Sequence, residues 1–318
     1  MGISLDRARE GFKLANQVAN KSPKTVKWYD AILIRFIRWL KEEKGGDDVE
    51  LADRDTLRAH VRHLQSDHKP YEGHPFHQLR DGKLSPATVR GHFATLSAFF
   101  NWMVAEELIA DSPMKNVPRP KVPKLIKPVF TQTDVAALLK ACDTLPRPLA
   151  ARSRAIVLFL LDTGARASEA MGLQMPELDI ERGRALIMGK GAKQRYVYLG
   201  KNSRRALWQY VSLYRPEPIA GVDNVFLTME GHPIRIDRLA KMLKQLGDIG
   251  GVENVHPHRF RRTAAVQFLR NPGSSVLSLQ KMLGHESLEM VRHYADLAAQ
   301  DVEVAHRTAS PVDNWDLR

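Results

Sequence analysis

Residues 118–129, PRPKVPKLIKPV, constrain the fold of this chain more than any other segment. Four prolines fall within twelve residues, and proline supplies no backbone N–H for a helix. The segment is therefore expected to be extended and to link two domains, which also suits a length of 318 residues. We predict an N-terminal domain over 1–117, a linker over 118–129 and a C-terminal domain over 130–318.

The linker is also strongly basic. It contains Arg119, Lys121, Lys124 and Lys127 and no acidic residue, which suggests that it lies against phosphates. In the whole chain 48 Lys and Arg stand against 36 Asp and Glu, a net charge of +12. Such an excess favours nucleic acid as a partner before a membrane surface, and the alternative is a basic surface without a specific partner.

Composition disfavours several other classes of protein. Cys142 is the single cysteine, so an internal disulfide and a Cys-based zinc site are excluded and a reducing compartment fits best. No apolar run reaches the roughly 18–20 residues of a membrane helix, and the N-terminal MGISLDRAREGFK lacks the apolar part of a secretory signal. Neither GxGxxG nor GxxxxGKS/T is present to indicate nucleotide binding. We expect a cytoplasmic protein.

The N-terminal domain is predicted to be helical. The Ser-Pro pairs at 22–23 and 85–86 each place a serine N-cap before a proline at the first helical position, and apolar residues follow at helical spacing. A third helix is expected over 55–65, and only about fifteen residues are expected before the first helix. Residues 66–84 contain three histidines among Gly and Pro. A polar loop is favoured there over a metal site, because no carboxylate or Cys stands at ligand spacing.

The C-terminal domain is predicted to combine helices with a small antiparallel sheet. A helix follows Phe130, residues 152–161 form a buried helix, and 185–199 indicate a strand, a glycine-rich turn and a second strand. Further helices are expected from about residues 203, 236, 260 and 276. The fold class is therefore mainly α, a helical N-terminal domain followed by a mixed α+β C-terminal domain.

Two motifs of the C-terminal domain offer cations for chemistry. In LDTGARASEAMGL, Arg166 and Glu169 share a helical face, either as a surface ion pair or as an arginine held by the glutamate and aimed at an anion. In the turn GKGAK, Lys190 is either solvated or able to reach into a cleft and donate a proton. An arginine suits an anionic oxygen pair because its planar fork donates two parallel hydrogen bonds.

The motif VHPHRFRRTAAV adds His258 and Arg261, which share a helical face because they are three residues apart. A zinc site at His256 and His258 is disfavoured, since the neighbouring arginines would repel the ion. The stretch GHESLEMVRHYADL then places His285, His293 and Tyr294 close together in sequence, and the stretch alone does not decide which of them reacts.

Taken together these residues suit phosphoryl transfer better than hydrolysis by activated water. The set has no carboxylate pair for a metal. Fixed cations stabilise charge on nonbridging phosphate oxygens, where positioning and electrostatics dominate the reaction. A tyrosine phenol can attack phosphorus and form a covalent ester that preserves the bond energy.

Four motifs in this order resemble the tyrosine recombinase, or phage integrase, family: TGARASE, GKGAKQR, HRFR, and LGH with a tyrosine nine residues on. The match runs from about residue 15 to the C-terminus, in a simple Xer-like or Cre-like layout. It implies six catalytic residues: Arg166, Lys190, His258, Arg261, His285 and Tyr294. Lys193 is the less favoured alternative to Lys190, Glu169 is supporting, and Arg262 stands where members often carry histidine.

The resemblance also implies the reaction. Tyr294 would attack the scissile phosphate, leaving a 3′-phosphotyrosyl link and a free 5′-hydroxyl, while Arg166 and Arg261 clamp the nonbridging oxygens. Lys190 would protonate the leaving 5′-oxygen and His258 would help to remove the tyrosine proton. No metal, ATP or other cofactor would be needed, because the ester stores the energy for religation.

His285 would hydrogen-bond the phosphate, which leaves His293 as a structural neighbour of the tyrosine. The N-terminal domain resembles the family's core-DNA-binding domain, and with the catalytic domain and the basic linker it would clamp double-stranded DNA at a specific recombination site. The resemblance implies a homotetramer on two DNA sites, reacting through a Holliday junction in the nucleoid-associated cytoplasm. The tail, 298–318, is expected to form a short helix that docks on a neighbouring protomer or packs on its own.

Two other functions share part of this pattern. A DNA-binding regulator without catalytic activity is disfavoured, because a degenerate integrase-like protein would be expected to have lost one of the six residues and the set is complete. An enzyme similar to a type IB topoisomerase would share the chemistry but would not exchange strands between two DNA segments.

Overall fold

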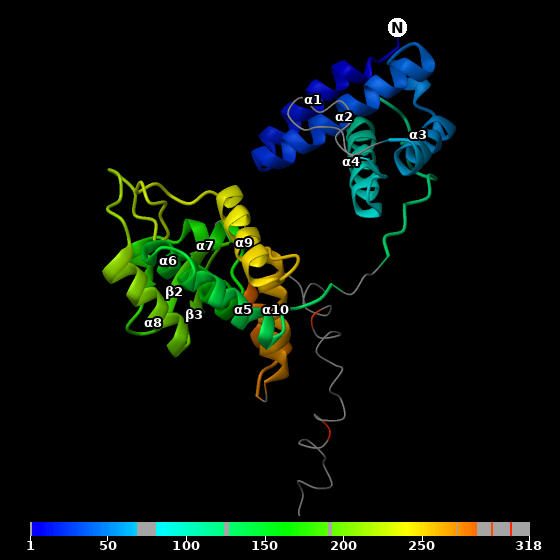
Figure 1. Ribbon diagram of the computed structural model, residues 1–318. Helices are drawn as coiled ribbons and strands as arrows, with labels where there is room; N and C mark the ends of the chain where they lie inside the picture. Colours follow the sequence, from blue (N-terminus) through cyan, green and yellow to red (C-terminus); the bar gives the residue numbers. More distant parts are fainter. Residues whose placement is uncertain are drawn as a thin grey trace, which may run out of the picture. The chain divides into compact units, whose positions relative to one another are not determined.

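The computed structural model describes residues 2–68, 81–123, 127–189, 193–271 and 273–284, together with residues 294 and 306. The chain divides into two compact units, Met1–Leu125 and Ile126–Arg318, and the division falls inside the proline-rich segment. The described parts of that segment contain neither helix nor strand. The fold is mainly helical with one small antiparallel sheet, as predicted (Figure 1).

Unit 1, Met1–Leu125, is built from helices around an aromatic core. They are α1 (Leu5–Val18), α2 (Pro23–Lys44), α3 (Arg54–Ser66) and α4 (Pro86–Ala105), with a short 3-10 turn at Val49–Leu51. The two predicted Ser-Pro starts are confirmed, because Ser22 and Ser85 each accept a hydrogen bond from the backbone N–H three residues on. Phe36, Phe99 and Phe100 are fully buried between the helices.

Helix α1 corrects the expectation that about fifteen residues precede the first helix. The helix begins at Leu5, with Ser4 as the N-cap accepting a hydrogen bond from the N–H of Arg7. It buries Leu5, Ala8 and Phe12, and the Phe12 ring packs on Phe99. The helix is stabilised mainly by this tertiary packing.

Unit 2, Ile126–Arg318, contains the remaining elements. Over residues 127–284 its described helices are α5 (Gln132–Asp143), α6 (Arg147–Thr163), α7 (Ala167–Gly172), α8 (Lys201–Gln209), a π-turn (Tyr210–Tyr214), α9 (Ile236–Gly250), α10 (Pro257–Arg270) and α11 (Val276–Leu283). A 3-10 turn at Met175–Glu177 leads into the sheet. Each helix predicted for this unit is present, and the buried helix predicted at 152–161 is the second half of α6.

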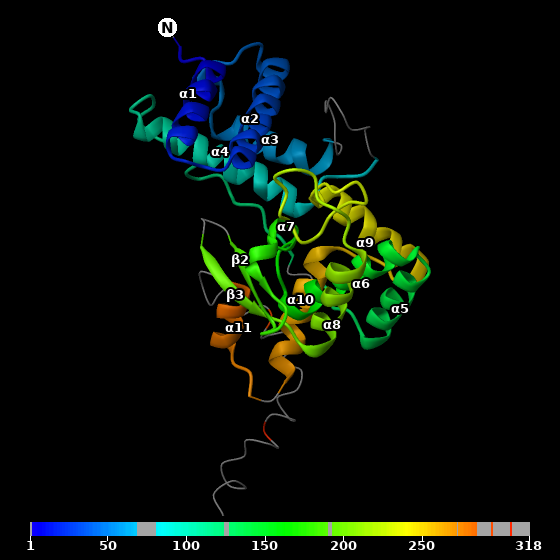
Figure 2. The same cartoon turned by 90° about the vertical axis from the view of Figure 1, so that its left-hand side faces the viewer.

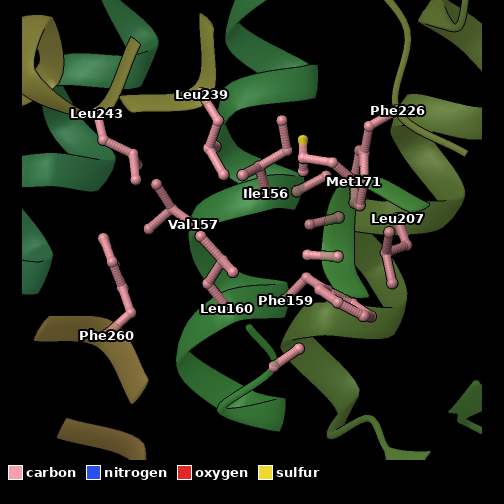
Figure 3. Close-up of a cluster of buried hydrophobic side chains, with 14 of the residues drawn as sticks. Ile156, Val157, Phe159, Leu160, Met171, Leu207, Phe226, Leu239, Leu243 and Phe260 are labelled. Carbon is pink, nitrogen blue, oxygen red and sulfur yellow. The ribbon is translucent and has the colours of Figure 1, made fainter. Parts of the chain in front are cut away.

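Helix α6 runs through the core of unit 2. Figure 3 shows Phe159 directed toward Leu207 and Phe226, while Val157 and Leu160 lie on the side of Leu243 and Phe260. A helix with apolar side chains on opposite faces is stable only when surrounded, and α5, α8 and α10 all pack on it. Truncating a fully buried residue such as Phe159 to alanine should cost about 3–5 kcal/mol.

The sheet has the order β1-β2-β3 and is antiparallel throughout. Strands β2 (Arg184–Met188) and β3 (Gln194–Tyr198) form the predicted hairpin, in which Leu186 lies opposite Tyr196. β1 (Leu178–Asp179) was not predicted, because two residues give no sequence periodicity. Helices α7 and α11 pack beside the hairpin (Figure 2), which brings three of the predicted motifs to one side of the unit.

Candidate active site

The corner between α6 and α7 presents Arg166. Gly164 ends α6 in the left-handed region, at φ 60°, and a Cβ there would lie 2.8 Å from a Leu283 methyl group. Arg166 follows as the N-cap of α7, where its backbone N–H donates to Glu169 Oε2 (2.7 Å) and its Nη1 to Oε1 (2.8 Å). The Glu169 side chain is only 2% exposed. Of the two arrangements expected for this pair, the structure therefore has Arg166 held by a buried glutamate, and not an ion pair on the surface.

Glu169 has a second cationic partner, Arg195 on β3. The two guanidinium Nη atoms donate to its two carboxylate oxygens at 2.9 and 2.8 Å. Burial alone would raise the pKa of Glu169, but the hydrogen bonds from Arg195 and Arg166 outweigh it and lower the pKa to about 2. The carboxylate is therefore ionised at neutral pH and holds Arg166 by charge as well as by geometry.

Arg261 lies at the centre of the site on α10. Its Nη1 donates to the carbonyl of Gly164 (2.7 Å) and its Nη2 to the carbonyl of Leu283 (2.9 Å), and the residue is 3% exposed. Burial, and then the nearby charge of Arg166, lower the pKa of Arg261 to about 10. The guanidinium thus stays charged at neutral pH while joining the Gly164 corner, α10 and the end of α11.

His258 lies one turn before Arg261 on α10 and is exposed to solvent. Partial desolvation of the ring, followed by the positive charges of Arg261, Arg262, Arg166 and Lys127, lowers its pKa. A neutral imidazole beside fixed cations can accept a proton. Desolvation, followed by the charges of Arg262, His258, Arg259 and Lys127, lowers the pKa of His256. No group of three or more His, Cys, Asp or Glu suited to a metal occurs among the described residues.

Tyr294 is half-buried and packs against the apolar cluster of Ala265, Leu279 and Leu283 between α10 and α11. It also lies close enough to Arg261 and Arg262 to act on the pKa of both. The structure therefore gathers Arg166, Arg261, His258 and Tyr294 into one region of unit 2, with Glu169 beneath.

Other predicted residues lie outside the described residues: Lys190, His285, His293, Lys124 and, apart from residue 306, the tail 298–318. Lys193, the alternative lysine, is exposed, and its carbonyl accepts a hydrogen bond from the Gly189 N–H at 2.8 Å. Three of the four linker cations are described, Arg119, Lys121 and Lys127, and all three are exposed. Within the described ranges, no helix combines the length and the apolar character needed to cross a membrane.

Two arginines important to the site were missed from the sequence. Arg195 closes the motif GKGAKQR, of which only the lysines were considered. Arg259 donates to the Val129 carbonyl (3.1 Å) and to Asp134 (3.2 Å), and stacks 4.1 Å over the Phe130 ring. It anchors the start of α5 to α10, whereas Arg261 and Arg262 lie near Tyr294.

Comparison with known proteins gives the family of the chain. The Phage integrase family matches residues 128–301. The tyrosine recombinase XerC of Lactobacillus delbrueckii subsp. bulgaricus is 32% identical over 297 residues, covering 91% of this chain and 94% of the relative. XerD of Listeria innocua serovar 6a is 30% identical over 288 residues, with 88% and 91% covered. The crystal structure of XerH recombinase bound to palindromic difH, a post-cleavage complex, has a TM-score of 0.69 at 19% identity, covering 92% of this chain and 81% of that one.

Fold, site and relatives together define a tyrosine site-specific recombinase, the class of enzyme predicted from the four motifs. The chain belongs to the phage integrase family.

Proposed function

We propose that Tyr294 of this recombinase attacks the scissile phosphate of duplex DNA, forms a 3′-phosphotyrosyl link and releases a 5′-hydroxyl. The observation that carries the proposal is the pair Arg166 and Arg261, each held by buried acceptors, with Arg261 close both to Arg166 and to the tyrosine. Two fixed guanidinium groups stabilise the charge that develops on the nonbridging oxygens without reorganising. Removing one such contact should cost about 2.7–4 kcal/mol in the transition state.

The proton transfers are assigned to the other members of the set. His258, whose pKa is lowered, accepts the Tyr294 proton, and Lys190 protonates the leaving 5′-oxygen. His285 hydrogen-bonds the phosphate. The reaction requires no metal or ATP, because the bond broken in DNA is replaced by a phosphotyrosyl ester that preserves the energy for religation.

We further propose that unit 1 binds the DNA around the recombination site, and that the exposed linker cations Arg119, Lys121 and Lys127 contact its phosphates. Phosphate contacts release counterions, so affinity should fall steeply with salt. Two DNA sites exchange strands through a Holliday junction within a homotetramer, in which the C-terminal tail exchanges between protomers. A cytoplasmic, nucleoid-associated location follows from such a substrate.

Covalent capture tests the nucleophile and finds the DNA site in one experiment. The full chain is incubated with a library of nicked duplexes of randomised sequence and denatured in detergent, and DNA that remains on protein is sequenced. Wild type should yield adducts at one site, with or without EDTA, whereas Tyr294→Phe should yield none. Adducts that survive Tyr294→Phe, or that require a divalent ion, contradict the proposal.

Strand exchange is then measured between two labelled copies of the captured site. Joint molecules are expected from wild type. Relaxation of supercoiled DNA without joint molecules would indicate the topoisomerase-like alternative.

A further inference from the structure

Arg195 has three acceptor atoms on two different elements of unit 2. Its Nη atoms donate to both oxygens of Glu169 on α7, and its Nε donates to the carbonyl of Met282 on α11 at 2.9 Å. The side chain is only 13% exposed. A planar guanidinium can satisfy these acceptors at once because its N–H groups diverge in a fixed fork, whereas a lysine ammonium cannot reproduce the paired geometry.

Two glycines pack on the same guanidinium. A Cβ at Gly284 would lie 2.9 Å from Arg195 Nη1, and a Cβ at Gly189 would lie 3.3 Å from that atom. Gly284 also has φ +64°, in the left-handed region that favours glycine. In the sequence, Gly189 immediately precedes Lys190 and Gly284 immediately precedes His285.

We propose that Arg195 is a positioning residue for strand cleavage, an inference that rests on the proposed function. Through Glu169 it fixes the guanidinium of Arg166, since the same carboxylate accepts hydrogen bonds from both arginines. Through its contact with Gly189 it fixes the backbone that leads into Lys190. Through Gly284 and the Met282 carbonyl it fixes the backbone that leads into His285. Arg195 touches no reacting atom in this role.

The test compares Arg195→Met and Arg195→Lys with Arg184→Met in the full chain. Arg184 is a matched control, because it lies on the neighbouring strand β2 and pairs with its own carboxylate, Asp179, at 3.3 Å. On the site found by covalent capture, both Arg195 variants should form adduct about 100-fold more slowly than wild type at saturating DNA. Their DNA affinity should stay within about threefold, because binding rests on many phosphate contacts. Arg184→Met should react at the wild-type rate.

A modified substrate separates positioning from a merely structural role. A methylphosphonate at the scissile position removes the nonbridging charge that Arg166 would neutralise, so the rate difference between wild type and Arg195→Met should shrink to about tenfold or less. Sulfur in place of the leaving 5′-oxygen removes the need for Lys190 to protonate the leaving group. On this substrate too, the rate difference between wild type and Arg195→Met should shrink.

Equal losses on all three substrates would overturn the proposal, as would wild-type rates in Arg195→Met. If wild type itself forms no adduct, the proposed function fails first. Arg195→Lys provides the second test if Arg195→Met folds poorly, because the ammonium keeps a positive charge beside Glu169 but loses the paired geometry. It should show the same substrate-dependent loss, and uniform loss here too contradicts the assignment.

Discussion

The two units treat buried titratable groups in opposite ways. In unit 2, Glu169 is 4% exposed and accepts hydrogen bonds from two arginine side chains and one backbone N–H. In unit 1, His60 is 2% exposed, and neither of its ring nitrogens has a hydrogen-bond partner among the described residues. Its ring lies instead 4.6 Å from the Trp39 ring and 4.9 Å from the Phe36 ring.

The pKa values follow from these surroundings. Burial, and then the neighbouring histidines, lower the pKa of His60 to about 3, and burial lowers that of His92 to about 4. Both rings are therefore neutral packing groups at neutral pH, while Glu169 is charged. Unit 2 buries an ionised carboxylate beside Arg166, whereas the described core of unit 1 buries these two histidines in their neutral form. The unfolded chain binds protons at these histidines more readily than the folded chain does, so the histidines weaken unit 1 more as the pH falls.

The largest effect is expected from removing the buried charge. Glu169→Gln preserves shape but leaves Arg166 and Arg195 facing a neutral amide, close to the buried Arg261. Breaking a buried ion pair in this way should lower the free energy of unfolding by about 3–5 kcal/mol. Denaturant unfolding measures this loss, and the rate of adduct formation should fall with it. If the free energy of unfolding changed by less than about 1 kcal/mol, the carboxylate charge would not be needed to compensate the arginines.

Acid should destabilise unit 1 before unit 2. Between pH 6.5 and about 4.5 the unfolded chain protonates His60 and His92 while the folded chain does not, so stability falls as pH falls. Each histidine contributes about 1.4 kcal/mol per pH unit. In unit 2 the pKa values of His256 and His258 are also lowered, but by less than those of His60 and His92. Glu169 adds to the loss only below its ordinary pKa of 4.5, as pH approaches 2. Hydrogen exchange at about pH 7 and 5 should show α3 losing protection before α6, and the reverse order would contradict the comparison.

Replacing one of the unpartnered rings should remove its share of that slope. His60→Leu fills similar space without a titrating group, and at about pH 5 it should raise the free energy of unfolding by about 2 kcal/mol relative to wild type. Urea unfolding at neutral and at acidic pH measures the difference. His232→Leu, at an exposed position in unit 2, is the control and should change stability by no more than about 0.5 kcal/mol. A pH slope that His60→Leu leaves intact would place the titration elsewhere.

Local signals predicted most of the fold. Ser-Pro starts fix α2 and α4 because the cap and the first helical residue are adjacent in sequence. In contrast, α1 and β1 are stabilised chiefly by distant partners: α1 packs against α4, and β1 consists of two residues paired with β2. Two residues give β1 no periodicity, whereas Ser4 and the buried Leu5, Ala8 and Phe12 at helical spacing were a local signal for α1 that was missed.

The same distinction applies to the site. The motifs and the pair at Arg166 and Glu169 could be found from short spacings. Arg195 could not, because its partners lie 26 residues before it and 87 residues after it, and only the folded sheet brings them together. The available signal was the place of Arg195 itself. It belongs to the motif GKGAKQR and lies on a strand, β3, whose alternate side chains point inward.

The smallest effect sharpens the contrast between buried and exposed charge. Arg154 and Asp143 form an ion pair at 2.7 Å, as short as the contacts of Glu169, but their side chains are 32% and 58% exposed. Water screens such a pair and solvates either partner left alone, so Asp143→Asn should lower the free energy of unfolding by less than about 1 kcal/mol. Urea unfolding beside Glu169→Gln measures both under one condition. Since the distances match, a loss of similar size in the two variants would mean that geometry, and not burial, sets the strength of these pairs.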